Sequence, residues 1–123
     1  MKAKTLFGFL GILILLLTGA VLAQSESQAI SLANEAKTIL DSAKSKDDYH
    51  RGAQKYEAAL KIFQRVKSDK GTDICSNELG IIQYRLGQYQ KALDYFEQSL
   101  VIRKKIGDIK GEGLSLNNIA AIC

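Results

Sequence analysis

The side chains that could do chemistry are few and scattered along this sequence. His50 is the only histidine, so it cannot by itself supply the group of ligands that a zinc site needs. Asp47 and Asp48 lie close to it, but carboxylates at a helix start are also explained by capping and by the helix dipole. We interpret His50 as a solvated residue near a helix start, with metal binding or acid–base catalysis as the alternative.

The two cysteines, Cys75 and Cys123, lie far apart in the sequence. They could form a disulfide in an exported protein if the fold brought their Cα atoms within about 7 Å. The favoured interpretation is two buried or partly buried free thiols. The sequence has no Cys-x-x-Cys motif, which argues against redox chemistry.

The glycines at positions 107, 111 and 113 could suggest a phosphate-binding loop, but no Gly-Lys-Ser/Thr follows them, so we interpret them as a turn. No Gly-x-Ser-x-Gly motif and no paired histidines occur. Aromatic residues recur at helical spacing and are expected in the core rather than in a ligand site. These are Tyr49, Tyr56, Tyr89, Tyr95 and Phe96. We therefore predict a protein that is not an enzyme and takes no cofactor or metal.

The first 23 residues have the layout of a secretory signal peptide. Two lysines precede an apolar block from Leu6 to Leu17, and Val21 and Ala23 occupy the −3 and −1 positions of a cleavage site. We predict cleavage after Ala23 and export to the periplasm or the exterior, with no stable membrane insertion afterwards. The alternative is an uncleaved membrane anchor formed by residues 6–23, which is just long enough to span a bilayer.

Composition is that of an ordinary globular chain, with 46% hydrophobic and 24% charged residues. The absence of proline favours long uninterrupted helices. Without the two lysines of the signal peptide, 15 basic residues (17 minus 2) face 13 acidic ones, a net charge of +2. This balance is too mild for a nucleic-acid surface.

A shift of 40 residues superimposes the second half of the chain on the first. It places Tyr56 on Phe96, Leu60 on Leu100, Gly71 on Gly111 and Asn77 on Asn117. A rival shift of 33 residues would put charged residues at positions equivalent to Leu79 and Gly80, where burial would be costly, so the 40-residue period is preferred.

Within each period the apolar residues recur at intervals of three and four, as in amphipathic helices. The sequence therefore predicts an all-α fold of antiparallel helix pairs. The expected helices cover residues 25–45 paired with 48–67, residues 72–86 paired with 88–106, and a further start at about residue 112.

The segment from Asn77 to Ser99 resembles a tetratricopeptide repeat. Its Leu79-Gly80 pair, the Gly87-x-Tyr89 that follows, and the later alternation of small and aromatic residues match the family pattern. The 40-residue spacing is similar to the longer subclass that includes kinesin light chains and many bacterial arrays. The resemblance implies a stacked solenoid of two repeats and the start of a third.

The predicted repeat region is residues 24–123, with a divergent first repeat (33–72), a second repeat (73–112) and an incomplete third (113–123). In the first repeat, Leu40 takes the place of Gly80 and Gly52 that of Ala92, so we expect a divergent cap. Because the third unit is only begun, we hypothesise that the chain is part of a longer array.

The resemblance also implies a concave groove lined by the first helix of each pair. The expected peptide-binding residues are Ile74, Asn77, Ile81, Tyr84, Arg85 and Asn117, with Leu114 and Ala121 nearby. An amide can donate and accept hydrogen bonds at once, which suits a peptide main chain.

The implied function is a non-catalytic scaffold that binds a peptide or partner protein. The alternatives are the sensory array of a larger enzyme, such as a caspase-like protease, and a truncated stub; ordinary surface polarity would equally explain the polar residues.

Overall fold

The computed structural model describes the backbone of residues 2–123 and the side chains of residues 8–123. Over this range the chain is helical throughout, joined by short turns, which confirms the all-α prediction. The helices are α1 (Lys2–Asp41), α2 (Lys46–Arg65), α3 (Asp69–Arg85), α4 (Tyr89–Ile106) and α5 (Ile109–Ile122).

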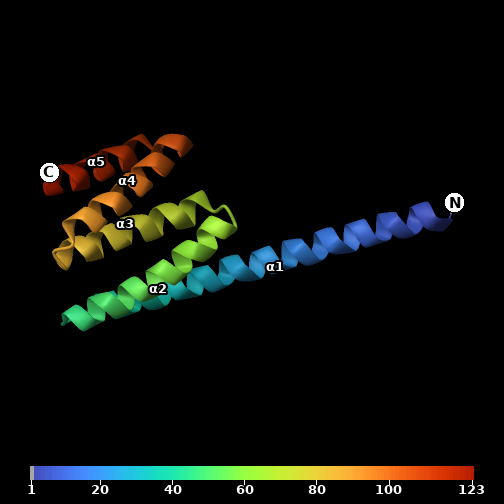
Figure 1. The fold of residues 1–123 in the computed structure, drawn as a ribbon, viewed down its shortest axis with the longest axis horizontal. Helices are drawn as coiled ribbons and strands as arrows, with labels where there is room; N and C mark the ends of the chain where they lie inside the picture. The colour runs from blue at the N-terminus through green and yellow to red at the C-terminus, as the bar shows by residue number, and fades with distance from the viewer. Residues whose placement is uncertain (1) are drawn as a thin grey trace.

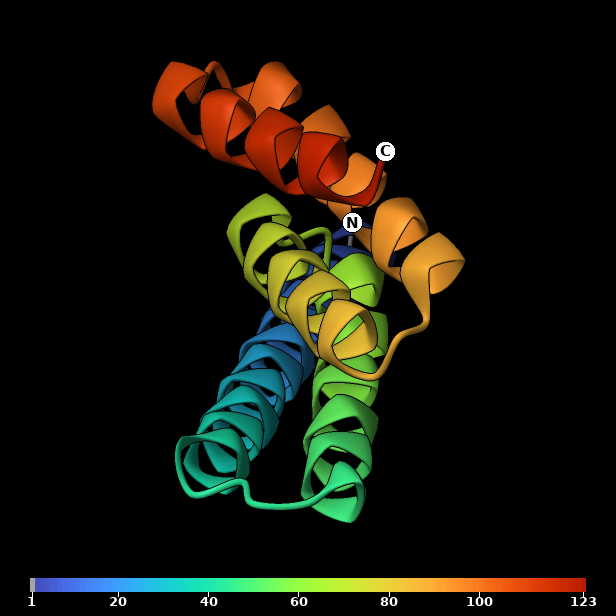
Figure 2. The same cartoon turned by 90° about the vertical axis from the view of Figure 1, so that its left-hand side faces the viewer.

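Each helix packs against the next one along the chain. In Figure 1 the helices run alternately to the left and to the right, from α1 and α2 at the bottom to α5 at the top. Figure 2 shows the stacking from another side, with α1 and α2 at one end and α5 at the other. The predicted arrangement of stacked antiparallel helix pairs is therefore confirmed, with α5 as the first helix of a third pair.

Side-chain caps define where three of the helices begin. Ser45 and Asp48 form a capping box at the start of α2, which confirms the capping interpretation of Asp48. Hydrogen bonds from the backbone of Lys44 and from the Arg51 side chain hold the pKa of the Asp48 carboxyl well below its usual range. His50 is exposed in α2 beside this cap.

The predicted starts of α3 and α5, at residues 72 and 112, are three residues too late. Ser68 and Asp108 accept hydrogen bonds from the backbone N–H groups of Gly71 and Gly111, which are already in the first helical turn. The turn after α4 is accordingly short. Only Gly107 in it needs a left-handed backbone, with a φ of 73°, and Gly113 lies inside α5.

Within the two complete pairs, large and small residues exchange places. A Cβ atom added to Gly80 on α3 would lie 2.5 Å from the Phe96 ring of α4. In the first pair a Cβ atom added to Gly52 on α2 would lie 2.7 Å from the Leu40 side chain of α1. The first pair thus keeps close helix packing with the small residue on its second helix, which explains the sequence divergence.

Helix α1 runs without a break through the predicted cleavage point after Ala23. The side chains of residues 8–24 are all exposed, and the first buried side chains of α1 are Ala29 and Ala36. Its apolar part is long enough to cross a membrane by length and composition, as both a signal sequence and an anchor would be. Met1 and the side chains of residues 2–7 lie outside the described part, and the signal peptide stays a prediction.

Both cysteines are free thiols. Cys75 is fully buried between α2 and α3, and burial raises its pKa to about 12. Cys123 is exposed, which corrects the expectation of burial for that residue. The reason is that the side of α5 on which it lies is not covered by another helix.

Candidate binding surface

Two clefts lie on either side of α3, on the surface to which α1, α3 and α5 contribute. The first has a volume of about 190 Å³ and is bounded by α1, α3 and a tyrosine from α2. The second has a volume of about 130 Å³ and lies between α3 and α5, with a phenylalanine from α4. Ile81 lines both clefts. We call the two clefts and the exposed side of α3 between them the first-helix surface.

The first cleft is lined by charged and aromatic groups. Arg85 donates a hydrogen bond to the Tyr49 hydroxyl across 3.1 Å, and its guanidinium lies 5.8 Å from the centre of that ring. Glu78 and Asp41 line the same cleft. Burial raises the pKa of the Glu78 carboxyl, and the neighbouring Asn77, Lys37 and Arg85 only partly offset this effect.

The second cleft is mostly apolar with an amide at its edge. Its lining residues are Ile81, Tyr84, Phe96, Asn118 and Ala121. The Tyr84 ring lies 5.5 Å from the ring of Tyr89 in a tilted arrangement, which fixes one wall. Asn118 on α5 donates a hydrogen bond to the Asn77 side chain on α3 at 3.4 Å. An apolar side chain flanked by a polar main chain would match these walls.

The structure brings together most, but not all, of the residues predicted from the sequence. Ile81, Tyr84 and Arg85 line the clefts, and Asn77 bridges α3 to α5. Ile74 is 45% exposed on α3 and lines neither cleft. Asn117 is exposed on α5, and it is its neighbour Asn118 that reaches Asn77.

Several residues of these clefts were missed by the sequence interpretation, and Tyr49, Glu78 and Asn118 are the polar or aromatic ones that bear on binding. Glu78 and Asn118 lie one 40-residue period apart, immediately after the two asparagines that were selected. The same period could therefore have identified them. Tyr49 is on a second helix, and its approach to Arg85 required knowledge of how α2 is placed beside α3.

A family model described as tetratricopeptide repeat matches residues 41–105, which is more than half of the chain. The chain belongs to the tetratricopeptide-repeat family. The matched segment covers α2, α3 and nearly all of α4, and it confirms the resemblance seen in the sequence. No curated protein and no solved structure matches the chain significantly. Tetratricopeptide repeats generally mediate protein–protein interactions and are typically non-catalytic.

A cluster of hydrogen-bonded polar side chains lies between α3, α4 and α5. Asp73 on α3 accepts hydrogen bonds from Ser99 and from Arg103 Nε, the latter at 2.8 Å. Arg103 Nη1 donates to the Gly111 carbonyl at 2.9 Å and to the Ser115 hydroxyl at 3.0 Å. Arg103 is bonded both to Asp73 and to the N-terminal half of α5, so the cluster positions helices rather than reacting groups.

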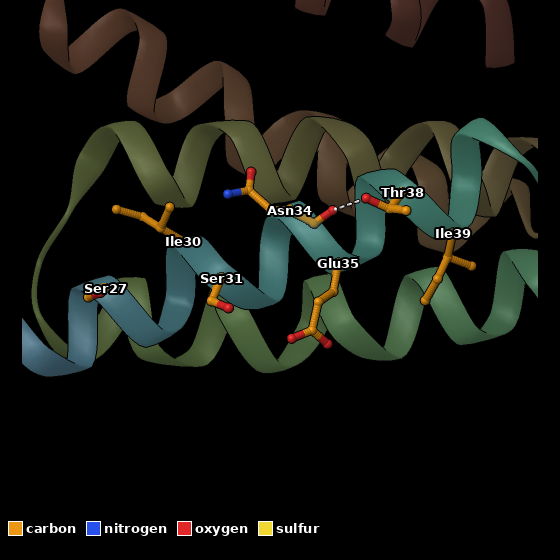
Figure 3. A pocket seen from close by; sticks show the side chains of 7 residues that line it. All are labelled: Ser27, Ile30, Ser31, Asn34, Glu35, Thr38 and Ile39. Atoms are coloured by element: carbon orange, nitrogen blue, oxygen red, sulfur yellow. Dashed lines mark hydrogen bonds between the residues drawn. The ribbon is translucent and has the colours of Figure 1, made fainter.

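A further hollow, an open depression of about 660 Å³, lies along α1. All seven side chains that line it are borne on this one helix (Figure 3). They are Ser27, Ile30, Ser31, Asn34, Glu35, Thr38 and Ile39. No second helix contributes to it, so it encloses no ligand. Among the described residues, no group of histidine, cysteine or carboxylate side chains could hold a metal ion.

Proposed function

We propose that this tetratricopeptide-repeat chain is a non-catalytic scaffold that binds an extended segment of a partner protein on the first-helix surface. The observation that carries the proposal is the pair of clefts on either side of α3, which share Ile81 as a common wall. A bound segment that crosses α3 would place one side chain in each cleft. Successive side chains of an extended strand point to opposite faces, so these would be alternate residues.

The two clefts call for different side chains. The second cleft is apolar and suits an aliphatic residue, because burying one there contributes about 1.5–3 kcal/mol. At its edge, Asn77 and Asn118 can both donate to and accept from a peptide main chain. The first cleft carries the Arg85 guanidinium beside two carboxylates, so it suits a polar side chain. Its mixed charge offers no basic surface for nucleic acid.

For localisation, we propose export with removal of residues 1–23. In support, the side chains of residues 8–24 are all exposed, so cleavage after Ala23 would uncover no core residue. The N-terminal mass of the exported product tests the proposal. A product that begins at Gln24 is expected, whereas one that retains the apolar segment and stays with the membrane fraction would favour an anchor.

The binding surface is tested by selecting peptides on the full chain, held in detergent, from a random display library. Ile81→Glu introduces a charge into both clefts and is expected to reduce the affinity of selected peptides at least tenfold, because an unpaired charge would be desolvated. Val101→Glu is the matched control, since Val101 is an exposed aliphatic residue on α4 that lines neither cleft. Equal loss in both variants, or loss in neither, would refute the proposed surface.

The amides are tested separately with the same peptides. Asn77→Ala combined with Asn118→Ala removes the bridging pair and should weaken binding, while Asn77→Ala combined with Asn117→Ala should lose no more than Asn77→Ala alone. If the Asn117 substitution has the larger effect, the main chain of the ligand contacts α5 further from α3 than the clefts imply.

A further inference from the structure

The turn after α2 and the turn after α4 lie one 40-residue period apart and at the same end of the array. In Figure 1 both turns are on the right, the side from which the apolar part of α1 extends toward the N-terminus. We call residues 64–71 and 104–111 the basic end, because six basic residues in them face two acidic ones, a net charge of +4. The basic residues, all exposed, are Arg65, Lys67, Lys70, Lys104, Lys105 and Lys110.

The opposite end of the array is neutral. Its two turns, residues 41–48 and 81–88, carry three basic and three acidic residues. The chain from residue 24 onward has a net charge of +2, so everything outside the basic end has a net charge of −2. Charge is therefore separated along the direction of the helices, and the mild overall balance conceals this separation.

Both acidic residues of the basic end are already engaged within it. Asp69 pairs with Lys105 across 3.1 Å, and Asp108 accepts a hydrogen bond from the backbone N–H of Gly111. Among the described side chains, the other five basic groups of this end take part in no ion pair. The basic end is therefore available to an anionic partner.

The exposure of the basic end does not depend on where the chain stops. Repeats of a solenoid stack side by side, so a further repeat would lie beside α5 and leave the ends of the helices in water. The first turn shows this directly, because Arg65, Lys67 and Lys70 are exposed although two more helices follow them. The basic residues of the second turn would stay exposed in the same way.

Helix α1 places the basic end beside a segment that is long enough to cross a membrane. It is one continuous helix, Lys2–Asp41, with its apolar part before the array. From Ala23, the last residue of that part, to Ala29, the first buried side chain, the helix rises about 9 Å. The headgroup layer on one side of a bilayer is about 5–8 Å thick. While the apolar part is in a membrane, the array therefore starts at the headgroup boundary, with the basic end toward the lipid (Figure 1).

We propose that the basic end binds the surface of a membrane that contains anionic lipids. Each lysine or arginine near such a surface favours the docked state about fivefold, because the headgroup phosphates are anionic. The apolar part of α1 supplies the attachment, and the basic end fixes the orientation of the array on the membrane. The proposal concerns the chain that still carries residues 1–23, as the precursor of an exported protein or as an anchored one.

The second turn of the basic end adds an apolar contact. Ile109 lies among the lysines of this turn and is 81% exposed. Asp69, its equivalent one period earlier, keeps 40% of its side chain exposed although α4 packs beside it, so a further helix would leave part of Ile109 exposed too. An isoleucine flanked by lysines suits a membrane interface, where the apolar side chain enters the acyl boundary and the ammonium groups stay with the headgroups.

Docking in this orientation would leave the first-helix surface open. Asp41, Tyr84 and Arg85, which line its two clefts, belong to the turns at the opposite end of the array. A partner segment bound there would lie away from the lipid. The basic end is therefore separate from the first-helix surface and does not depend on the function proposed for it.

The test places a nitroxide spin label at either end of the array in the full chain. Gln64→Cys carries the label in the basic end and Gln88→Cys in the opposite end, since both glutamines are exposed. Cys123→Ser removes the exposed natural thiol, while Cys75 is fully buried and stays in place. The chain is reconstituted in vesicles of phosphatidylcholine, with or without about 30% phosphatidylglycerol. Collisions of each label with the water-soluble complex NiEDDA are measured by electron paramagnetic resonance.

We expect phosphatidylglycerol to lower the collision rate of the basic-end label about twofold or more and to leave that of the opposite-end label unchanged. Lys70→Glu combined with Lys110→Glu removes two equivalent lysines of the basic end. It should shift the equilibrium away from the docked state at least about 25-fold and restore the collisions. Lys44→Glu combined with Lys46→Glu is the matched control, because it makes the same change in net charge at the opposite end and should leave docking intact.

Three results would overturn the proposal. Equal collision rates with and without phosphatidylglycerol would show that the basic end does not bind anionic lipid. Equal effects of the two double substitutions would show that net charge alone matters. Release of the basic end by a polyglutamate peptide, while anionic lipid is in excess, would assign this surface to an acidic protein instead. Ile81→Glu alters only the first-helix surface and should leave docking unchanged, so either proposal can fail while the other stands.

Discussion

The joint between α2 and α3 and the joint between α4 and α5 occupy equivalent places in successive repeats. Five positions can be compared directly by the 40-residue period. In the first joint they are Ala33, Ala59, Phe63, Gly71 and Cys75, and in the second they are Asp73, Ser99, Arg103, Gly111 and Ser115. Four of these five positions are buried in both joints, the exception being the half-buried pair Ala33 and Asp73, but an apolar set in one becomes a polar set in the other.

The comparison shows that the repeat specifies burial and size, while the chemistry of the joint is free to vary. Phe63 fills the space over Gly71 in the first joint, and the stem of Arg103 approaches Gly111 in the second. The first joint is held by apolar burial, which is not directional. The second is held by hydrogen bonds from Arg103, which fix the angle of α5. Among the described side chains, no buried polar atom is left without a partner.

The largest effect is expected from removing one member of the charged pair. Asp73→Ala leaves the Arg103 guanidinium in a setting where the two side chains are only 11% and 13% exposed. We expect the free energy of unfolding, measured by urea titration and circular dichroism, to fall by about 3–5 kcal/mol. Lys105→Ala, which breaks the exposed pair with Asp69, should change it by less than about 1 kcal/mol.

The converse change gives the second joint the chemistry of the first. A variant with Asp73→Ala, Ser99→Ala, Arg103→Phe and Ser115→Cys should be at least as stable as the natural chain, because replacing a buried ion pair by packed apolar groups is often neutral or stabilising. If this variant is as unstable as Asp73→Ala alone, the two joints are not equivalent in shape.

A smaller effect is expected from alanine substitutions at the two glycines in the centres of the joints, and the loss of stability should differ between them. A Cβ atom on Gly71 would lie 2.2 Å from the rigid Phe63 ring, so Gly71→Ala should cost about 1–3 kcal/mol. A Cβ atom on Gly111 would lie nearest the Asp108 carboxylate, which is the end of a side chain that can turn away, and 2.9 Å from the Arg103 stem. Gly111→Ala should therefore lose mainly the cap, about 1 kcal/mol, and regain part of it in helix propensity. Thermal unfolding of the two variants side by side gives the comparison, and equal costs would contradict it.

The period that makes these comparisons possible was available from the sequence, and so was the fold. Tyr56 and Phe96 could be recognised by type, because they are large aromatic residues one period apart, and both are buried. The same reasoning was wrong for Tyr89, which lies one period after Tyr49 and is 55% exposed. The Arg103 cluster could not be predicted in this way. An arginine in a basic run before a turn is typical of an exposed helix end, and only the placement of α3 beside α4 brings Asp73 to it. The sequence also could not show that Asn118, rather than Asn117, faces α3. The 40-residue period places both residues near α3, but it does not distinguish between adjacent positions on a helix.

The smallest effect concerns a charge that only the first joint has at its edge. Glu78 lies there, and one period later the neutral Asn118 takes its place. Burial raises the folded-state pKa of Glu78 above its usual value near 4.5, so its carboxyl favours folding below that pH. This contribution is lost as the pH rises through the raised pKa. Glu78→Gln should therefore be more stable than the natural chain at pH 7, with a difference that disappears at acid pH below 4.5. Urea titrations at several pH values give the two curves.

Asp94→Asn, which removes an exposed carboxylate from α4, serves as the control, and its stability should follow that of the natural chain at every pH. If Glu78→Gln also ran parallel to it at every pH, Arg85 and Lys37 would have to be compensating the burial of Glu78 in full, and the edges of the two joints would then be electrostatically alike.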